Sequence, residues 1–296
     1  MRRFAVIFSI AMAAPGCTDR CFIEGLNCEN IDPPQGFSAL ALGRDHSCGL
    51  RRNYEFECWG TDHAGSTLPR TGIFSAIAAG DRHTCALDVY AIACWGDPSL
   101  PQVQVPPFNK FGAVVAGAEF TCGAASGGTG STECWGDNTY GQTTPPNIAL
   151  RIIAAGREHA CGTASFDGGV RCWGRNDAGQ APASIAGDFV ALTAGDRHTC
   201  GLAASGAVTC WGEMPGGIPP PAIKFRRISA GSFHTCGITM EDLRIVCWGD
   251  DSDGQASPPA GRFEEIASGP RHSCAITERS DALCWGANDA GQGDVP

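Results

Sequence analysis

The sequence predicts an all-β protein, and more specifically a seven-bladed β-propeller with three to four short antiparallel strands per blade. Forty glycines and nineteen prolines among 296 residues favour many short elements joined by tight turns. A unit of 36 to 39 residues recurs seven times along the chain. Within it, apolar and polar residues alternate with a period near two in segments such as FVALTAG and VTCWG, which is typical of strands. No segment shows a sustained series of apolar residues at helical spacing.

The first sixteen residues are predicted to be a signal peptide. The stretch MRRFAVIFSIAMAAPGC holds two arginines, an apolar run and then small residues, and it is too short to span a membrane. Residues 14–17 resemble the lipobox of bacterial lipoproteins, although Ala14 stands where a leucine is usual. We therefore expect Cys17 to carry the lipid, and cleavage by the ordinary signal peptidase is the alternative.

Residues 17–36 are predicted to be a tether outside the repeats. The chain has 17 cysteines, and fourteen of them fall into regular pairs within the repeats. The odd total is explained if Cys17 is lipidated while Cys21 and Cys28 form a small disulfide loop.

The seven units fill residues 37–296, and each contains a cysteine pair whose second member is followed directly by tryptophan and glycine. Because the units run almost end to end with no capping segment, a closed ring is favoured over an open stack. The pairs are Cys48/Cys58, Cys85/Cys94, Cys122/Cys134, Cys161/Cys172, Cys200/Cys210, Cys236/Cys247 and Cys274/Cys284.

These pairs are predicted to be cross-strand disulfides, one in each blade. A zinc site built from His83, Cys85 and Cys94 is the competing interpretation, since the first two lie on one face of a strand. Disulfides are favoured because the chain is expected to be exported, and because Phe120 replaces the histidine in the third unit while its cysteines persist. No metal and no cofactor are therefore predicted.

The tryptophan of each pair must point to the face of its strand opposite the disulfide. We expect it to pack against the next blade, with the disulfide facing the previous one. Six repeated histidines are predicted to be hydrogen-bonded structural residues, because catalysis needs one poised base rather than six copies. His63 lies outside this repeated position.

The patterns Ala-Gly-x-x-His-x-x-Ala-Leu and Trp-Gly-x-Asn-x-x-Gly-Gln resemble the repeat of the regulator of chromosome condensation family. The resemblance covers residues 37–296 and is nearest in style to secreted bacterial members such as β-lactamase inhibitory protein II. It implies a propeller that binds other proteins through loops on one face. Phe120 and the segment GEMPGGIPPP of the fifth unit depart from the pattern.

The net charge of -10, with no cluster of lysine and arginine, disfavours binding to nucleic acid or anionic lipid. Common catalytic motifs are missing from the sequence, and the chain is predicted not to be an enzyme. We expect a non-catalytic monomer that binds a protein or envelope component, with the membrane reached only through a lipid anchor. The expected location is the outer membrane or cell surface, or alternatively the secreted fraction.

Binding residues are sought in the loops after Cys-Trp-Gly, where the copies differ. Acidic loops would favour a partner with a basic patch, and Tyr140 is the best single anchor because aromatic side chains dominate binding energy. An inhibitor of a secreted or periplasmic enzyme and a glycan-binding or glycan-active propeller are the alternatives, and guanine nucleotide exchange is disfavoured behind a signal peptide. The candidates are Asp62, His63, Asn138, Tyr140, Arg175, Asp177, Asp251, Asp253, Asn288 and Asp289.

Overall fold

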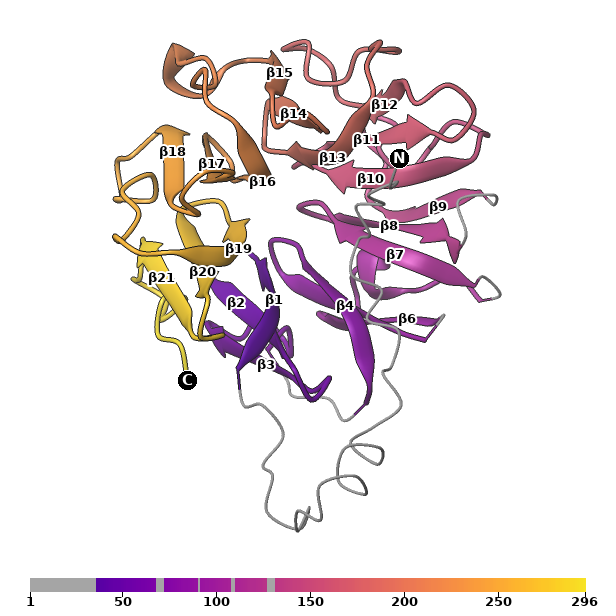
Figure 1. The fold of residues 1–296 in the computed structure, drawn as a ribbon. Coiled ribbons are helices and arrows are strands. Elements are labelled where there is room, and N and C mark those ends of the chain that lie inside the picture. The colour runs from indigo at the N-terminus through magenta and orange to yellow at the C-terminus, as the bar shows by residue number, and fades with distance from the viewer. Residues whose placement is uncertain (1–35, 68–71, 90, 108–109, 127–130) are drawn as a thin grey trace, which may run out of the picture.

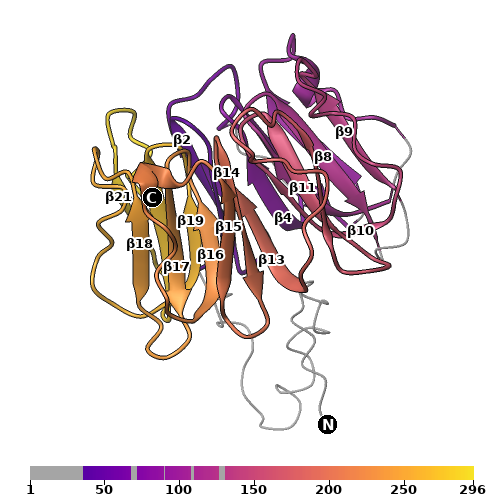
Figure 2. The same cartoon turned by 90° about the horizontal axis from the view of Figure 1, so that it is seen from above.

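The computed structural model describes residues 36–67, 72–89, 91–107, 110–126 and 131–296, which form seven three-stranded antiparallel sheets in a ring (Figure 1). Each sheet is one blade and comes from one sequence unit, so the predicted propeller is confirmed with the lower of the two predicted strand numbers. Figure 2 shows the ring turned by 90°, with the strands running between its two faces. The predicted signal peptide, the lipidation at Cys17 and the Cys21/Cys28 bridge lie outside the described residues.

Each blade consists of an inner strand beside the axis, a middle strand and an outer strand, in sequence order. Blades 1 to 4 contain β1 (Phe37–Leu42), β2 (His46–Arg51), β3 (Phe56–Gly60), β4 (Phe74–Ala79), β5 (His83–Asp88), β6 (Ala91–Gly96), β7 (Phe111–Ala116), β8 (Phe120–Ala125), β9 (Thr132–Gly136), β10 (Leu150–Ala155), β11 (His159–Ala164) and β12 (Val170–Gly174). Blades 5 to 7 contain β13 (Phe189–Ala194), β14 (His198–Ala203), β15 (Val208–Gly212), β16 (Phe225–Ala230), β17 (His234–Thr239), β18 (Ile245–Gly249), β19 (Phe263–Ser268), β20 (His272–Thr277) and β21 (Ala282–Gly286).

The described helical elements are two short 3-10 turns, η2 (Pro101–Val103) and η4 (Pro215–Gly217), in the loops that follow blades 2 and 5. Within the described ranges, no helix has the length and apolar character that a membrane span requires.

The disulfides join directly opposed residues of the middle and outer strands. Cys85 pairs with Cys94 in the register of β5 and β6, and their Cα atoms are 4.1 Å apart. Such a short separation belongs to the narrow, non-hydrogen-bonded pair of an antiparallel ladder. All seven predicted repeat disulfides are present: Cys48–Cys58, Cys85–Cys94, Cys122–Cys134, Cys161–Cys172, Cys200–Cys210, Cys236–Cys247 and Cys274–Cys284.

The core is divided into seven apolar clusters, one between each pair of neighbouring blades. The cluster between blades 7 and 1 contains Ile276 and Ala282 from one side and Phe37 and Trp59 from the other, and it closes the ring. In the described part of the chain, every blade therefore packs between two neighbours, as a closed ring requires.

The predicted directions of tryptophan and disulfide are wrong. Trp95 packs on Leu50 and Phe56 of the preceding blade, whereas Cys85 lies against Phe111 and Trp135 of the following blade. The alternation of side chains along a strand places the two groups on opposite faces, as expected. It does not tell which neighbour each face meets, because that depends on the direction in which the blades succeed one another around the axis.

The repeated histidines connect neighbouring blades by hydrogen bonds, as the prediction of a structural role requires. In a typical interface, Nε2 of His46 lies 2.9 Å from Oγ1 of Thr84 in the next blade, and that hydroxyl donates to the carbonyl of Ser66 at 2.9 Å. The indole Nε1 of Trp95 donates to the same carbonyl at 3.1 Å. Since the hydroxyl is already a donor, Nε2 of His46 carries a proton and donates it to the threonine oxygen.

The glycine of each Ala-Gly step allows the blades to approach closely around the axis. A Cβ atom at Gly80 would lie 2.2 Å from Cε1 of His83 and 2.4 Å from the carbonyl oxygen of Gly117 in the next blade. Close approach rather than a positive φ therefore requires glycine at this position. The glycines of neighbouring blades form a tight ring that leaves only a small axial cavity.

Candidate functional site

The loops that follow Cys-Trp-Gly lie at the same end of the blades as the Ala-Gly-x-x-His turns. The first loop residue donates its N–H to the carbonyl of the second variable residue of that turn, as in Thr61 to Asp45 at 2.8 Å and Arg175 to Glu158 at 2.9 Å. In an antiparallel blade, the turns between middle and outer strands must lie at the other end. We call the end with the two sets of loops the loop face.

In the loops that carry the Asn-x-x-Gly-Gln motif, after blades 3, 4 and 7, the asparagine and glutamine are structural residues. Gln142 is buried, its Oε1 accepts the N–H of Tyr140 at 2.8 Å, and its Nε2 donates to Asp137 at 2.7 Å. Its backbone carbonyl accepts the indole N–H of Trp173 in the next blade. The loop motif therefore fixes the loop and also completes the interface between blades.

Four of the predicted binding residues are occupied in the same way. The side-chain oxygen of each accepts a hydrogen bond from the backbone N–H five residues ahead, at 2.7 to 3.0 Å. Such a bond closes the loop, so this oxygen is not free to bind a ligand. These residues are Asp62, Asn138, Asp251 and Asn288.

Arg175 and Asp177 belong to a chain of ion pairs that crosses blades 4 and 5. Arg175 contacts Glu158 and Asp177, both at 2.7 Å, and Arg197 continues the chain at 3.4 Å from Asp177 and 2.6 Å from Glu213. The hydrogen bond from Arg175, with the nearby positive charge, lowers the pKa of Asp177 to about 2. These groups are partly or fully exposed to solvent, so the chain of ion pairs fixes side-chain positions more than it stabilises the fold.

Tyr140 is the most prominent predicted residue of the loop face. Its side chain is 46% exposed, and the guanidinium carbon of Arg175 lies 5.0 Å from its ring centroid. Because two carboxylates hold Arg175 in place, its cation–π contact also restricts the position of the Tyr140 ring. The structure thus brings Tyr140, Arg175 and Asp177 together.

The remaining predicted residues form two separate groups. Arg271 contacts Asp253 at 2.8 Å and Asp289 at 3.1 Å, which joins the loops of blades 6 and 7. His63 contacts Asp45 at 3.1 Å at the edge of blade 1. Arg271 and Asp45 themselves were missed, although both occupy the second variable place of Ala-Gly-x-x-His.

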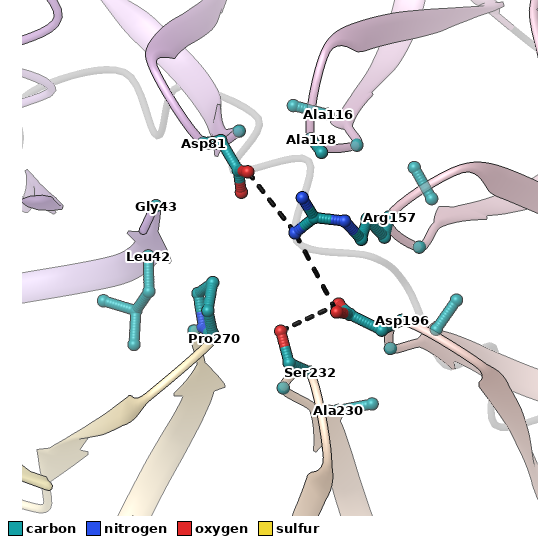
Figure 3. Close-up of a pocket in the computed structure, with 18 of the residues that line it drawn as sticks. Leu42, Gly43, Asp81, Ala116, Ala118, Arg157, Asp196, Ala230, Ser232 and Pro270 are labelled. Carbon is teal, nitrogen blue, oxygen red and sulfur yellow. Dashed lines mark hydrogen bonds and ion pairs between the residues drawn. The ribbon is translucent and has the colours of Figure 1, made fainter. Parts of the chain in front are cut away.

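The first variable place of that turn lies around the propeller axis and was also missed. The seven residues there are Arg44, Asp81, Ala118, Arg157, Asp196, Ser232 and Pro270. All except Arg44 line an axial cavity of about 120 Å³, whose wall is otherwise made of Leu42, alanines, glycines and a serine (Figure 3). The signal was visible in the sequence, because charge varies strongly from copy to copy at a position flanked by nearly constant residues.

Charged groups meet at the cavity. Nη1 of Arg157 lies 3.5 Å from Oδ2 of Asp81 and 3.9 Å from Oδ2 of Asp196, so this arginine lies between the two carboxylates (Figure 3). Ser232 donates to the other oxygen of Asp196 at 2.7 Å. Burial raises the pKa of Asp196, partly offset by Ser232 and Arg157.

The loop after blade 5 does not accept the tryptophan N–H of the next blade, unlike the corresponding loops of other blades. It carries GEMPGGIPPP in place of the asparagine and glutamine motif, and Nε1 of buried Trp248 has no hydrogen-bond partner. Ile218 of this loop and Phe233 of the turn before β17 are each nearly half exposed. This sector of the loop face is therefore more apolar than its counterparts in the other blades.

The repeated histidines are unsuited to acid–base chemistry with a substrate. His83 is fully buried, and burial, with the nearby His46, lowers its pKa to about 3. The other five are equally enclosed, and burial likewise lowers the pKa of each to about 3 or 4. Among the residues that the structure describes, no group of three or more His, Cys, Asp or Glu side chains is placed to hold a metal ion.

Comparison with known families finds four matches to the regulator of chromosome condensation (RCC1) repeat. They span residues 151–180, 189–215, 225–255 and 263–292, which are the units of blades 4 to 7.

Comparison with solved structures finds propellers. The CRINKLY WD40 ectodomain of the Arabidopsis thaliana receptor kinase ACR4 is 27% identical with a TM-score of 0.72, over 86% of this chain and 97% of that one. The ectodomain of the Physcomitrella patens receptor kinase CR4 is 25% identical with a TM-score of 0.72, over 85% and 74%. Prp20p from Saccharomyces cerevisiae, 16% identical with a TM-score of 0.66 over 85% and 83%, supports the fold alone.

Proposed function

We propose that this chain, a propeller in which four blades match the regulator of chromosome condensation repeat, is a non-catalytic module that binds a protein partner through its loop face. One observation carries this proposal. Residues that are constant among the seven units build the interfaces between blades, whereas both variable places of the Ala-Gly-x-x-His turn and the loops after Cys-Trp-Gly gather at one end. Variation confined to one face is what a binding surface on a repeated scaffold requires.

The chemistry of the loop face fits a protein partner. Tyr140 offers a partly exposed aromatic ring on a fixed arginine, and rigid aromatic side chains of this kind supply much of the energy of protein interfaces. Around it, ion-paired arginines and carboxylates form a polar rim. Among the structural neighbours, Prp20p has been studied for its binding to Gsp1p and histones, which agrees with a protein partner for this fold.

The seven disulfides indicate an oxidising environment, outside the cell or in an exported compartment. The receptor ectodomains with related propellers agree with such a location. We further propose that the module is held at the cell envelope by a lipid on Cys17 and a tether over residues 17–36. Mass spectrometry of the N-terminal peptide tests the anchor: an acylated Cys17 supports it, and an unmodified thiol or cleavage elsewhere contradicts it.

Affinity capture tests the binding face. The oxidised protein is immobilised and exposed to envelope and culture fractions, in parallel with the variants Tyr140→Ala and Phe166→Ala. Phe166 is a matched control, since its ring is 70% exposed but lies in the turn between β11 and β12 at the opposite end. We expect one protein to be retained by the wild type and by Phe166→Ala, and to be lost with Tyr140→Ala.

Capture of polysaccharide alone contradicts the proposal and favours the glycan-binding alternative. A β-lactamase inhibition assay with the same preparations tests the inhibitor alternative directly.

A further inference from the structure

Phe233 occupies a place of the Ala-Gly-x-x-His turn that carries a charge in every other unit. It is the second variable residue of the turn, and its counterparts are Asp45, Arg82, Glu119, Glu158, Arg197 and Arg271. The backbone contact is the same, because the carbonyl of Phe233 accepts the N–H of Asp250 at 2.8 Å, as that of Asp45 accepts the N–H of Thr61. Blade 6 therefore presents an aromatic ring, 48% exposed, where the other blades present a charged side chain.

The loop after blade 5 adds a second apolar side chain to the same part of the loop face. Ile218 of this loop is 45% exposed. A Cβ atom at Gly216 would lie 3.7 Å from both Cδ1 of Ile218 and the carbonyl carbon of Gly249, which directly precedes Asp250. Ile218 and Phe233, which we call the apolar pair, thus lie near the same peptide of blade 6. Exposed apolar side chains that gather on a polar face are typical of interaction sites.

The loop that carries Ile218 is attached to the next blade by fewer hydrogen bonds than the other loops. At the six other interfaces, the tryptophan indole donates to a backbone carbonyl of the preceding loop, at 2.9 to 3.1 Å. Among the described residues, none accepts the indole N–H of Trp248. Gly216 and Gly217 both have a positive φ, which glycine adopts without strain. This construction allows Ile218 to adjust to a bound side chain.

The surroundings of the apolar pair are negatively charged. Asp250 and Asp251 accept hydrogen bonds from neutral groups of their own loop, and in the described part of the chain no lysine or arginine pairs with them. Because these bonds close the loop, the two carboxylates act on a partner through their charge. Glu213, in the loop after blade 5, is 62% exposed and pairs with Arg197 at 2.6 Å. The excess of negative charge favours a positively charged partner.

This charge restricts what can cover the apolar pair. A second copy of the chain, docked through the same surface, would bring acidic loops together, and an anionic lipid surface would be repelled in the same way. A protein segment in which lysines or arginines flank an apolar side chain matches both the apolar pair and the acidic loop beside it.

We propose that the partner of the loop face presents such a basic segment, whose apolar side chain packs against Ile218 and Phe233 while its cationic side chains lie near Asp250 and Asp251. This inference rests on the proposed function, because it specifies the chemistry by which the loop face recognises its protein partner. It adds a contact on blades 5 and 6 to the contact expected at Tyr140.

Fluorescence anisotropy with labelled peptides tests this recognition on the oxidised protein. The probe is Lys-Arg-Leu-Arg-Lys. Its matched analogues are Lys-Arg-Ser-Arg-Lys, which lacks the apolar side chain, and Glu-Asp-Leu-Asp-Glu, in which the charges are reversed. We expect the probe to bind with a Kd below about 1 mM and each analogue to bind at least about tenfold more weakly. Binding of the probe should weaken as the salt concentration rises.

Variants locate the binding. Phe233→Ser and Ile218→Ser are each expected to weaken binding of the probe by about tenfold. Asp251→Asn removes a charge but keeps the oxygen that closes the loop, and is expected to weaken binding by about threefold. The controls Ile223→Ser and Glu241→Gln change a 41% exposed apolar side chain and an exposed carboxylate at the opposite end of the blades, and should leave binding unchanged.

Affinity capture separates failure of this inference from failure of the proposed function. A protein that is retained equally by the wild type and by Phe233→Ser supports the binding function and contradicts the role of the apolar pair. A probe that binds and responds to the variants, while no protein is captured, supports the recognition chemistry and contradicts the binding function.

Three further results overturn the inference. The first is a failure of the probe to bind below about 1 mM. The second is equal binding of Lys-Arg-Ser-Arg-Lys, which indicates attraction by charge alone. The third is a dimer in analytical ultracentrifugation that Phe233→Ser dissociates, which shows that a second copy of the chain covers the apolar pair. Exposed positions tolerate substitution, so unchanged unfolding temperatures verify that the variants are folded.

Discussion

Phe120 and Ala160 lie in one apolar cluster between blades 3 and 4, at the place where the six other interfaces join a histidine to a hydroxyl. The histidine and its hydroxyl partner have thus both been replaced at the same interface, although the two residues are 40 positions apart in the sequence. A buried polar group without its partner is costly, whereas an apolar pair of suitable shape is not. The interface therefore behaves as a unit that is either polar on both sides or apolar on both.

A double substitution at the neighbouring interface tests this coupling. In the structure, Nε2 of His83 lies 2.9 Å from Oγ1 of Thr121. Thr121→Ala alone leaves the imidazole N–H buried without a partner and is expected to lower the free energy of unfolding by about 1–3 kcal/mol. His83→Phe with Thr121→Ala recreates the Phe120/Ala160 pair and is expected to cost less than the sum of the single changes.

Denaturant unfolding of the oxidised single and double variants measures the coupling energy. We expect about 1–2 kcal/mol. Additivity within about 0.5 kcal/mol would show that the two positions are independent and that the paired replacement is unrelated to interface stability.

The buried histidines predict a loss of stability in mild acid. Their pKa is lowered by burial to about 3 or 4 in the folded protein, against about 6.5 when unfolded. Between these values the unfolded chain binds more protons, so stability is complete above about pH 6.5 and declines as the pH falls toward the folded values. Each histidine is expected to contribute a loss of about 2 kcal/mol between pH 6.5 and 5.

Unfolding temperatures recorded from pH 8 to pH 5 measure this effect. The His83→Phe, Thr121→Ala protein is the control, because it has one titrating histidine fewer and should show a shallower decline. An unfolding temperature that is constant over this range would mean that the histidines are protonated or exposed in the folded protein.

Because the indole N–H of Trp248 has no hydrogen-bond partner, replacing Trp248 by phenylalanine should cost less unfolding free energy than the same change at Trp173. Trp173→Phe removes a hydrogen bond and leaves the carbonyl of Gln142 with one donor fewer, whereas Trp248→Phe removes an N–H that has no partner. Both side chains are buried, so the loss of apolar contact is similar. We expect Trp173→Phe to cost about 1 kcal/mol more in unfolding free energy. Equal costs in denaturant unfolding would indicate that Trp248 has an acceptor after all.

The repeat and its spacing were sufficient to predict the ring, the disulfide partners and the structural role of the histidines, because these depend on contacts that recur in every blade. The direction of Trp95 was predicted wrongly, since strand alternation defines two faces but not the order of blades around the axis. The part that Gln142 plays in the blade interface was not predicted, because its carbonyl accepts from a tryptophan that lies 31 residues further along the chain. Asp81, Arg157 and Asp196 were missed because the search for variable residues was confined to the loops after Cys-Trp-Gly, although charge also varies between copies at this turn position.

Removal of one disulfide tests how far these bonds stabilise the blades. Cys85 is fully buried and is bonded to Cys94 across a separation of nine residues. In the chain-entropy account, a closed loop of this length restricts the unfolded chain by about 2.5 kcal/mol. The Cys85→Ala, Cys94→Ala protein is therefore expected to lose about 2–3 kcal/mol in denaturant unfolding while it keeps its native β-sheet circular dichroism. Because the apolar cluster with Phe111 and Trp135 persists beside the two alanines, the ring should remain closed, and collapse of the fold would mean that this bridge is required for folding rather than only for stability.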